Sequence, residues 1–180
     1  MNGHILLITG PREAGKTTLC QRCVEAARQR GWRVTGIVTL GEYMNGERVS
    51  LQAQCAHTGE VRTLAHRQRG GGRHWAFVEE TLEWGNRVLA SAVPTDLLVI
   101  DELGPLEWVE GRGWTAGLSA VDSGLYRYAL VVVRPELVEH ARRRWPHATR
   151  LRLDRTPSPA SGWRSQAPPG PFIVPPQAAR

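Results

Sequence analysis

The chain has 180 residues, the size of one ordinary domain, and its 41% hydrophobic and 22% charged residues exclude an intrinsically disordered protein. Three units of its +6 net charge come from Arg155, Arg164 and Arg180, after the last acid, so the remaining surplus is too small to predict nucleic-acid binding. Apolar runs such as residues 129–133 are too short to cross a bilayer, and the first residues lack a secretory signal. We therefore expect a cytoplasmic protein without membrane contact.

Strand and helix signals alternate along most of the chain. The first half predicts a strand at 4–9, a helix at 16–30, a strand at 32–40, a turn at 45–46, and a hairpin with strands at 48–56 and 60–65. The second half predicts a helix at 78–92, a strand at 97–100, a short helix at 115–123, a strand at 130–133, a helix at 135–145 and a last strand at 149–153.

This alternation predicts an α/β fold around a mainly parallel sheet, because strands buried on both faces need helices on each side. We expect one domain over residues 1–155, with a β-hairpin inserted at about 45–66. Residues 156–180 hold seven of the twelve prolines and little periodicity, which predicts an extended or disordered tail.

The three cysteines are too few for a disulfide framework and fit a reducing compartment. Cys20 and Cys23 form a C-x-x-C pair on a predicted helix, but no second pair of ligands accompanies them. We interpret both as small buried apolar side chains rather than as a metal or redox site.

The strongest motif is GPREAGKT at residues 10–17, which follows a predicted strand and opens a predicted helix. Such a loop wraps a phosphate chain, because its glycines allow close approach while backbone N–H groups and the helix N-terminus attract the anion. Lys16, the only lysine, should reach the β- and γ-phosphates, and the Thr17 hydroxyl should bind Mg²⁺. The expected nucleotide contacts are Gly10, Pro11, Arg12, Glu13, Ala14, Gly15, Lys16, Thr17 and Thr18.

Glu13 occupies a position at which many phosphate loops have glycine. A carboxylate that faced the phosphates would repel them, so we expect the Glu13 side chain to point away from the bound nucleotide.

A second signal follows the strand predicted at 97–100, which ends in Asp101-Glu102. Ligands of open α/β sheets bind at the carboxyl ends of the strands. Asp101 is therefore expected to hold Mg²⁺, through water, and Glu102 to orient or deprotonate an attacking water.

The run DELGPLE at 101–107, together with residues 10–18 and 36–39, resembles the thermophile-type nucleoside-triphosphatase family of P-loop proteins. The resemblance covers about residues 3–155. It implies a three-layer P-loop NTPase fold in which the strand 130–133 is inserted between the strand of the phosphate loop and the strand that ends at Asp101. It also implies Mg²⁺-dependent hydrolysis of nucleoside triphosphates to diphosphates with broad base tolerance.

The chain departs from this family after the inserted strand, where family members often have a histidine and this chain has Arg134. Our hypothesis is that Arg134 senses or stabilises the γ-phosphate, as an arginine finger supplied in cis would. The alternative is an arginine on a solvated helix start. The family's late Asn-Arg-Asp-like stretch, which the resemblance links to base recognition, is matched here only by Asp154-Arg155-Thr156.

Two basic loops have two interpretations. Each could contact the nucleotide, or each could be an ordinary surface loop exposed to solvent. Arg112 lies between two glycines and could close over a nucleotide, as lid loops do. Arg67, Arg69 and Arg73 flank a triple glycine and could meet phosphate.

Two other functions use the same phosphate loop. A nucleotide or small-molecule kinase would need an acceptor pocket, which the hairpin at 48–65 and the loop at 67–73 could supply. A nucleotide-gated switch would instead bind a protein partner, with the proline-rich tail or exposed tryptophans as contacts.

Overall fold

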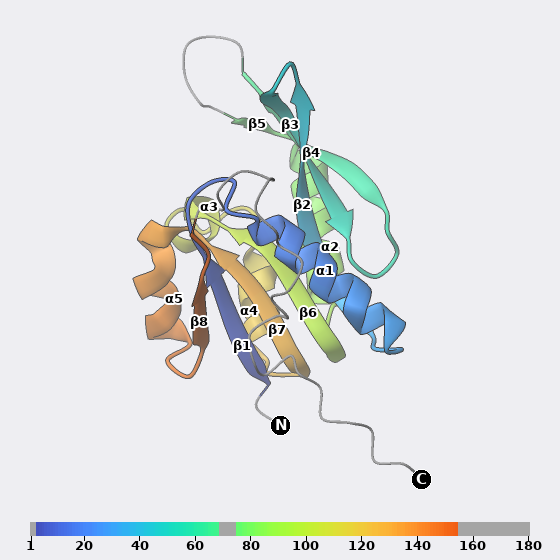
Figure 1. The fold of residues 1–180 in the computed structure, drawn as a ribbon, viewed down its shortest axis with the longest axis vertical. Coiled ribbons are helices and arrows are strands. Elements are labelled where there is room, and N and C mark those ends of the chain that lie inside the picture. Colours follow the sequence, from blue (N-terminus) through green and yellow to red (C-terminus); the bar gives the residue numbers. More distant parts are fainter. Residues whose placement is uncertain (1–2, 69–74, 155–180) are drawn as a thin grey trace.

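The computed structural model describes residues 3–68 and 75–154, which form an eight-stranded sheet with helices on both faces (Figure 1). The strands are β1 (His4–Thr9), β2 (Val34–Met44), β3 (Glu47–Cys55), β4 (Val61–Arg67), β5 (Trp75–Phe77), β6 (Thr95–Leu103), β7 (Tyr126–Val133) and β8 (Thr149–Arg152). The helices are α1 (Lys16–Gln29), α2 (Glu79–Ala90), α3 (Pro105–Trp108), α4 (Thr115–Asp122), η1 (Pro135–Leu137) and α5 (Val138–Arg144).

The strand order is β5-β4-β3-β2-β6-β7-β1-β8. Strands β2, β6, β7, β1 and β8 are parallel, whereas β3, β4 and β5 are added to β2 in antiparallel fashion. Ala129 of β7 pairs with Ile5 of β1 on one side and with Leu98 of β6 on the other. The expected insertion of this strand between β1 and β6 is therefore confirmed.

Alternating side chains of the central strands feed two separate cores. Leu6 and Ile8 pack with Cys20 and Val24 of α1 on one face. On the opposite face, Ile5 and Leu7 pack with the buried residues of α2, α4 and α5. Because both faces of the sheet are covered, the predicted three-layer α/β architecture is confirmed (Figure 1).

The inserted unit is larger than the hairpin predicted at 45–66. Strand β2 continues to Met44, and Asn45 and Gly46 join it to β3 with φ angles of 51° and 79°. This pair of left-handed residues is typical of a tight hairpin turn. Strand β5 then pairs with β4, so the insertion is a meander of β2 to β5.

Two local differences concern short elements. The helix predicted at 135–145 starts as the 3₁₀ turn η1 before α5, and the single turn α3 was not predicted. The prolines at the start of η1 and α3 favour such short turns, because proline presets the backbone angle of a first helical residue.

Three expectations lie outside the described residues: the tail at 156–180, the triple glycine, and the flanking Arg69 and Arg73. Within 3–68 and 75–154, no helix is long and apolar enough to span a membrane.

Candidate active site

The phosphate loop connects β1 to α1 at the carboxyl edge of the sheet, and its backbone requires glycine at two positions. Gly15 has φ 86° immediately before α1. Gly10 has φ 145°, and a Cβ at this position would lie 2.1 Å from the carbonyl oxygen of Leu153. No side chain caps the N-terminus of α1, and its first turn carries no acid. Its N–H groups are therefore available to an anion.

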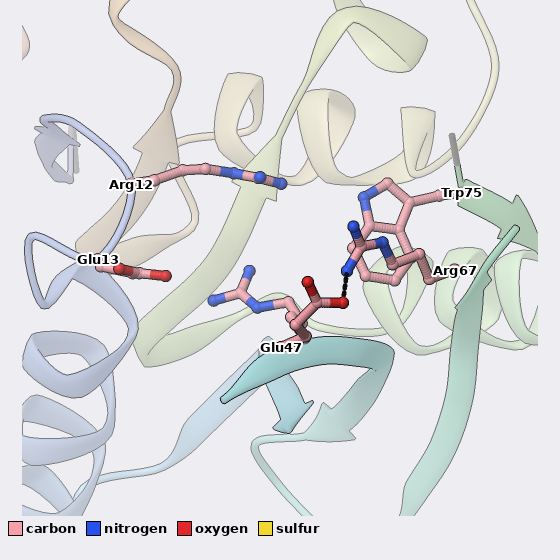
Figure 2. A pocket seen from close by; sticks show the side chains of 6 residues that line it. Arg12, Glu13, Glu47, Arg67 and Trp75 are labelled. Carbon is pink, nitrogen blue, oxygen red and sulfur yellow. Dashed lines mark hydrogen bonds and ion pairs between the residues drawn. The ribbon is translucent and has the colours of Figure 1, made fainter. Parts of the chain in front are cut away.

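Two side chains of the loop turn toward a pocket rather than back into the loop. Figure 2 shows Arg12 and Glu13 extending toward Glu47, Arg67 and Trp75 on the opposite wall. Glu13 is exposed and has φ 62°, in the left-handed region that glycine adopts most easily. Glu13 therefore adopts the left-handed backbone angle that suits the glycine found at this position in many phosphate loops.

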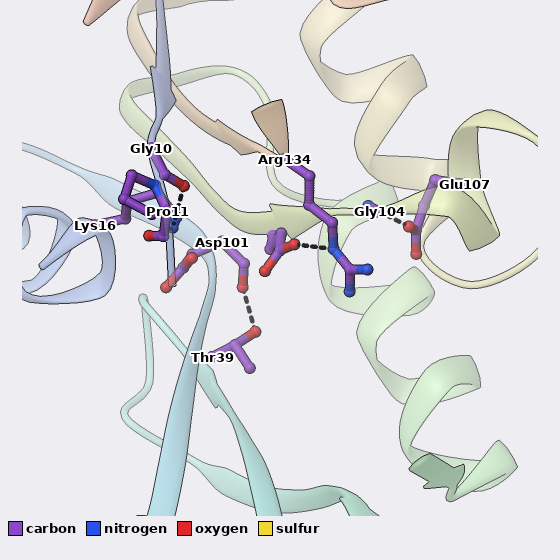
Figure 3. A network of polar contacts seen from close by, with 9 residues as sticks. Gly10, Pro11, Lys16, Thr39, Asp101, Gly104, Glu107 and Arg134 are labelled. Atoms are coloured by element: carbon purple, nitrogen blue, oxygen red, sulfur yellow. Dashed lines mark hydrogen bonds and ion pairs between the residues drawn. The ribbon is translucent and has the colours of Figure 1, made fainter. Parts of the chain in front are cut away.

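Lys16 folds back over the loop that precedes it. Its Nζ donates hydrogen bonds to the carbonyl oxygens of Gly10, at 2.9 Å, and Pro11, at 2.7 Å (Figure 3). Burial lowers the pKa of Lys16, whereas the nearby charges of Glu102 and Asp101 raise it. The ammonium group thus lies between the phosphate loop and the acidic end of β6.

Asp101 is buried near the carboxyl end of β6, and one of its carboxylate oxygens, Oδ2, has no hydrogen-bond partner. Burial raises the pKa of Asp101 to about 7, although a hydrogen bond from the Thr17 side chain and the charge of Lys16 lower it. The Thr39 hydroxyl donates to the Asp101 carbonyl oxygen and fixes the end of β6 against β2 (Figure 3). An orphaned buried oxygen of this kind is costly unless a ligand uses it.

These oxygens fit a hard divalent cation. Mg²⁺ prefers oxygen ligands and binds through one or two protein groups, with phosphate and water oxygens completing its shell. Asp101 Oδ2 and the Thr17 hydroxyl supply such groups beside the phosphate loop. Among the residues that the structure describes, no cluster of three or more His, Cys, Asp or Glu could hold a metal without such help.

Arg134 reaches the same site from the neighbouring strand. Its Nε donates to Oε1 of Glu102 at 2.5 Å (Figure 3). The two side chains are partly open to solvent, at 48% and 33% exposure. Arg134 directly follows β7, which lies beside β6, and this pairing brings the arginine to the carboxylate. The structure therefore groups Lys16, Thr17, Asp101, Glu102 and Arg134, while the contact of Arg134 with a γ-phosphate stays a prediction.

Glu107 is a further residue of this region that the sequence interpretation missed. It is buried, and its two carboxylate oxygens accept the backbone N–H groups of Gly104, at 2.7 Å, and Trp114, at 2.8 Å. Burial raises the pKa of Glu107, while these N–H groups lower it. Glu107 is the third residue of the helical turn α3, three residues after the N-cap Gly104, and an acid at this spacing is a capping pattern, which was the available signal.

The other expected basic residues pair with acids that are not among the five grouped residues. The ion pair of Arg112 is with Glu110, at 3.6 Å, and that of Arg67 is with Glu47, at 2.7 Å. At the edge of the described chain, Asp154 accepts a hydrogen bond from Arg152.

The two helical cysteines match their interpretation as apolar side chains. Cys20 is fully buried and Cys23 partly buried, and both are free. Burial raises the pKa of Cys23 to about 11, so its thiol stays protonated at neutral pH.

Residues 5–113 match the model of a protein family described as NTPase. Similar proteins bear the name nucleoside-triphosphatase THEP1. One from Caldivirga maquilingensis is 35% identical over 105 residues, covering 57% of this chain and 60% of the relative. One from Thermofilum pendens is 33% identical over 65% of this chain and 67% of the relative, and one from Methanopyrus kandleri is 27% identical over 84% and 82%.

Coverage of the relatives is incomplete. The chain spans 60% of the Caldivirga protein and 64% of a relative from Thermococcus kodakarensis, which is less than two thirds of either. Among solved structures, that of a human cancer-related nucleoside triphosphatase is similar with a TM-score of 0.60 and 23% identity, over 83% of this chain and 88% of the human one. At this identity the likeness shows the fold alone.

Proposed function

Because the chain belongs to the NTPase family whose model matches residues 5–113, we propose that it is a Mg²⁺-dependent hydrolase of nucleoside triphosphates. The products are a nucleoside diphosphate and phosphate, and several bases are accepted. The observation that carries this proposal is the unpartnered buried oxygen of Asp101 between the phosphate loop and Glu102. A loop that binds phosphates and two carboxylates at the same sheet edge suits phosphoryl transfer to water.

Binding begins at the phosphate loop. Backbone N–H groups of the loop and of the first turn of α1 receive the β-phosphate. Lys16 exchanges its two carbonyl partners, Gly10 and Pro11, for oxygens of the β- and γ-phosphates. Asp101 and Thr17 would hold the cation, which would neutralise part of the charge on the triphosphate.

Hydrolysis then needs a positioned water. Glu102 accepts a hydrogen bond from this water and takes its proton as the water oxygen bonds to the γ-phosphorus. The bond to the bridging oxygen breaks, and the diphosphate leaves with that electron pair. Arg134, already within 2.5 Å of Glu102, orients the carboxylate or turns to the γ-phosphate as its charge spreads.

The test is phosphate release from ATP, GTP, CTP and UTP with Mg²⁺, comparing the full chain with Lys16→Ala and Glu102→Gln. We expect repeated turnover on several bases and a loss of roughly 100-fold or more in each variant. The matched control is Arg62→Gln, an exposed arginine paired with Glu60 at a distance of 2.7 Å, which should turn over normally. Equal rates in the wild type and Lys16→Ala would contradict the proposal.

A further inference from the structure

A pocket of about 190 Å³ lies between the phosphate loop and the inserted meander (Figure 2). One wall is formed by two residues of the loop, and the other by residues at the start of β3, the end of β4 and the start of β5. The lining side chains are Arg12, Glu13, Glu47, Arg48, Arg67 and Trp75. The hydrolysis proposed above uses none of these side chains, so the pocket needs its own explanation.

Only some of the charged side chains that line the pocket are paired with an opposite charge. Arg67 and Glu47 neutralise each other at 2.7 Å, as the dashed line in Figure 2 shows. Arg48 donates from Nε and Nη2 to the Tyr43 hydroxyl, at 3.1 and 2.7 Å, and stacks on that ring. Within the described chain, neither Arg48 nor Arg12 has a carboxylate at ion-pair distance. Among the described residues, these two guanidinium groups therefore have no anionic partner.

Arg12 and Glu13 belong to the phosphate loop and line the pocket, and Arg48 lines it from the start of β3. Because this loop is proposed to bind the triphosphate, with Lys16 at the γ-phosphate, the pocket borders the phosphate end of the bound nucleotide.

Glu13 adds a second, independent observation. Its φ of 62° lies in the left-handed region, which is strained for any residue other than glycine. Strained residues that persist are concentrated at binding sites. In this pocket the carboxylate opposes an anion held by the arginines, so it limits how tightly the anion is retained.

We propose that this pocket is a second anion site, which holds a phosphate-type oxyanion between Arg48 and Arg12 beside the γ-phosphate position. Guanidinium groups match the oxygen geometry of phosphate and remain charged at any physiological pH. The inference rests on the proposed function only for the source of the ion. That source is either the phosphate released by hydrolysis or a phosphate monoester that serves as an acceptor, as the kinase alternative requires.

The test measures binding rather than turnover. Inorganic phosphate is titrated by calorimetry into the full chain with Mg²⁺ and saturating ADP, so that the phosphate loop is already occupied. We expect Arg48→Gln to weaken phosphate binding by roughly 10-fold or more, and Glu13→Gln to tighten it several-fold. Arg62→Gln, which removes one arginine outside the pocket, should leave the affinity unchanged.

Two results would overturn the proposal. One is the absence of phosphate binding once ADP is bound. The other is binding that Arg134→Gln weakens and that Arg48→Gln and Glu13→Gln leave unchanged, because the ion would then occupy the γ-phosphate position itself. Thermal unfolding of each variant checks that the fold is intact.

A parallel titration with adenosine monophosphate distinguishes the two sources. If inorganic phosphate binds more tightly than adenosine monophosphate, and Arg48→Gln weakens its binding, the pocket is a site for the released product. Tighter binding of the monoester, with the same sensitivity, identifies an acceptor site. The hydrolase proposal can fail independently of this one. A protein that binds phosphate in this pocket but releases no phosphate from triphosphates would contradict the hydrolase proposal and still support the anion site.

Discussion

Arg134 donates a hydrogen bond to Glu102 across the ends of two neighbouring parallel strands, at a distance of 2.5 Å. The carboxylate proposed to handle the attacking water is therefore paired with a cation from the neighbouring strand. This pairing holds Glu102 and places a positive charge beside its carboxylate. A change at either residue should affect turnover more than nucleotide binding.

Arg134→Ala should lower kcat by at least roughly 10-fold while the Kd for nucleotide changes little, because an arginine of this kind acts mainly on the transition state. Phosphate release at saturating ATP and direct binding of ADP measure the two quantities. Arg127→Ala is the matched control, since Arg127 lies at the opposite end of β7, over the ring of Trp32. An unchanged kcat in Arg134→Ala would remove the arginine from the mechanism.

Asp101→Asn should raise the Mg²⁺ concentration needed for half-maximal turnover by roughly 10-fold or more, because a neutral amide is a weaker ligand for a hard cation than a carboxylate. The measurement is a Mg²⁺ titration of phosphate release at fixed ATP. The matched control is Asp96→Asn, an acid at the opposite end of the same strand that pairs with Arg127. Identical Mg²⁺ dependence in Asp101→Asn and the wild type would contradict the assignment of the metal ligand.

Glu107→Ala should lower the free energy of unfolding by about 2–5 kcal/mol, because two buried N–H groups, those of Gly104 and Trp114, would lose their acceptor. Urea unfolding measures the change. Glu110→Ala is the comparison, since its ion pair with Arg112 is exposed and should contribute less than about 1 kcal/mol. A loss in Glu107→Ala no larger than that of Glu110→Ala would show that the loop does not depend on this carboxylate.

Stability in acid should depend on Asp122, which ties α4 to Arg144 and Trp145 near the end of α5. Partial burial raises the pKa of Asp122, but hydrogen bonds from Arg144 and Trp145 outweigh this and hold it below its usual value. A lowered folded-state pKa adds stability above the unfolded pKa of about 4, and this stability is lost as pH falls through the folded pKa.

The Asp122→Asn variant isolates this contribution. Its free energy of unfolding should fall less steeply below about pH 4 than that of the wild type, by a modest amount because the pair is partly exposed. Unfolding in urea at a series of pH values measures both slopes. Parallel slopes in the two proteins would exclude the carboxylate as a source of acid sensitivity.

The local features of this protein could be predicted from sequence because they depend on neighbouring residues. The spacing of apolar residues indicated the central strands and α1, α2 and α4. The GPREAGKT loop indicated phosphate binding, since its glycines and lysine act within one turn of chain. The acids at 101–102 were expected at the same sheet edge, because parallel strands end together.

Only the tertiary structure decided which of these pieces meet. Strand β5 has only three residues, too few to show a periodic pattern in the sequence. It is defined by its pairing with the neighbouring strand β4. The contact of Arg134 with Glu102 exists because β7 is inserted beside β6, and the pocket exists because the meander faces the phosphate loop. For Glu107, the spacing to Gly104 was a local signal, but its second partner, the N–H of Trp114, is seven residues away and is brought to the carboxylate only by the folded loop. Sequence thus determined the chemistry of the groups, whereas the pairing of distant strands determined which groups can act together.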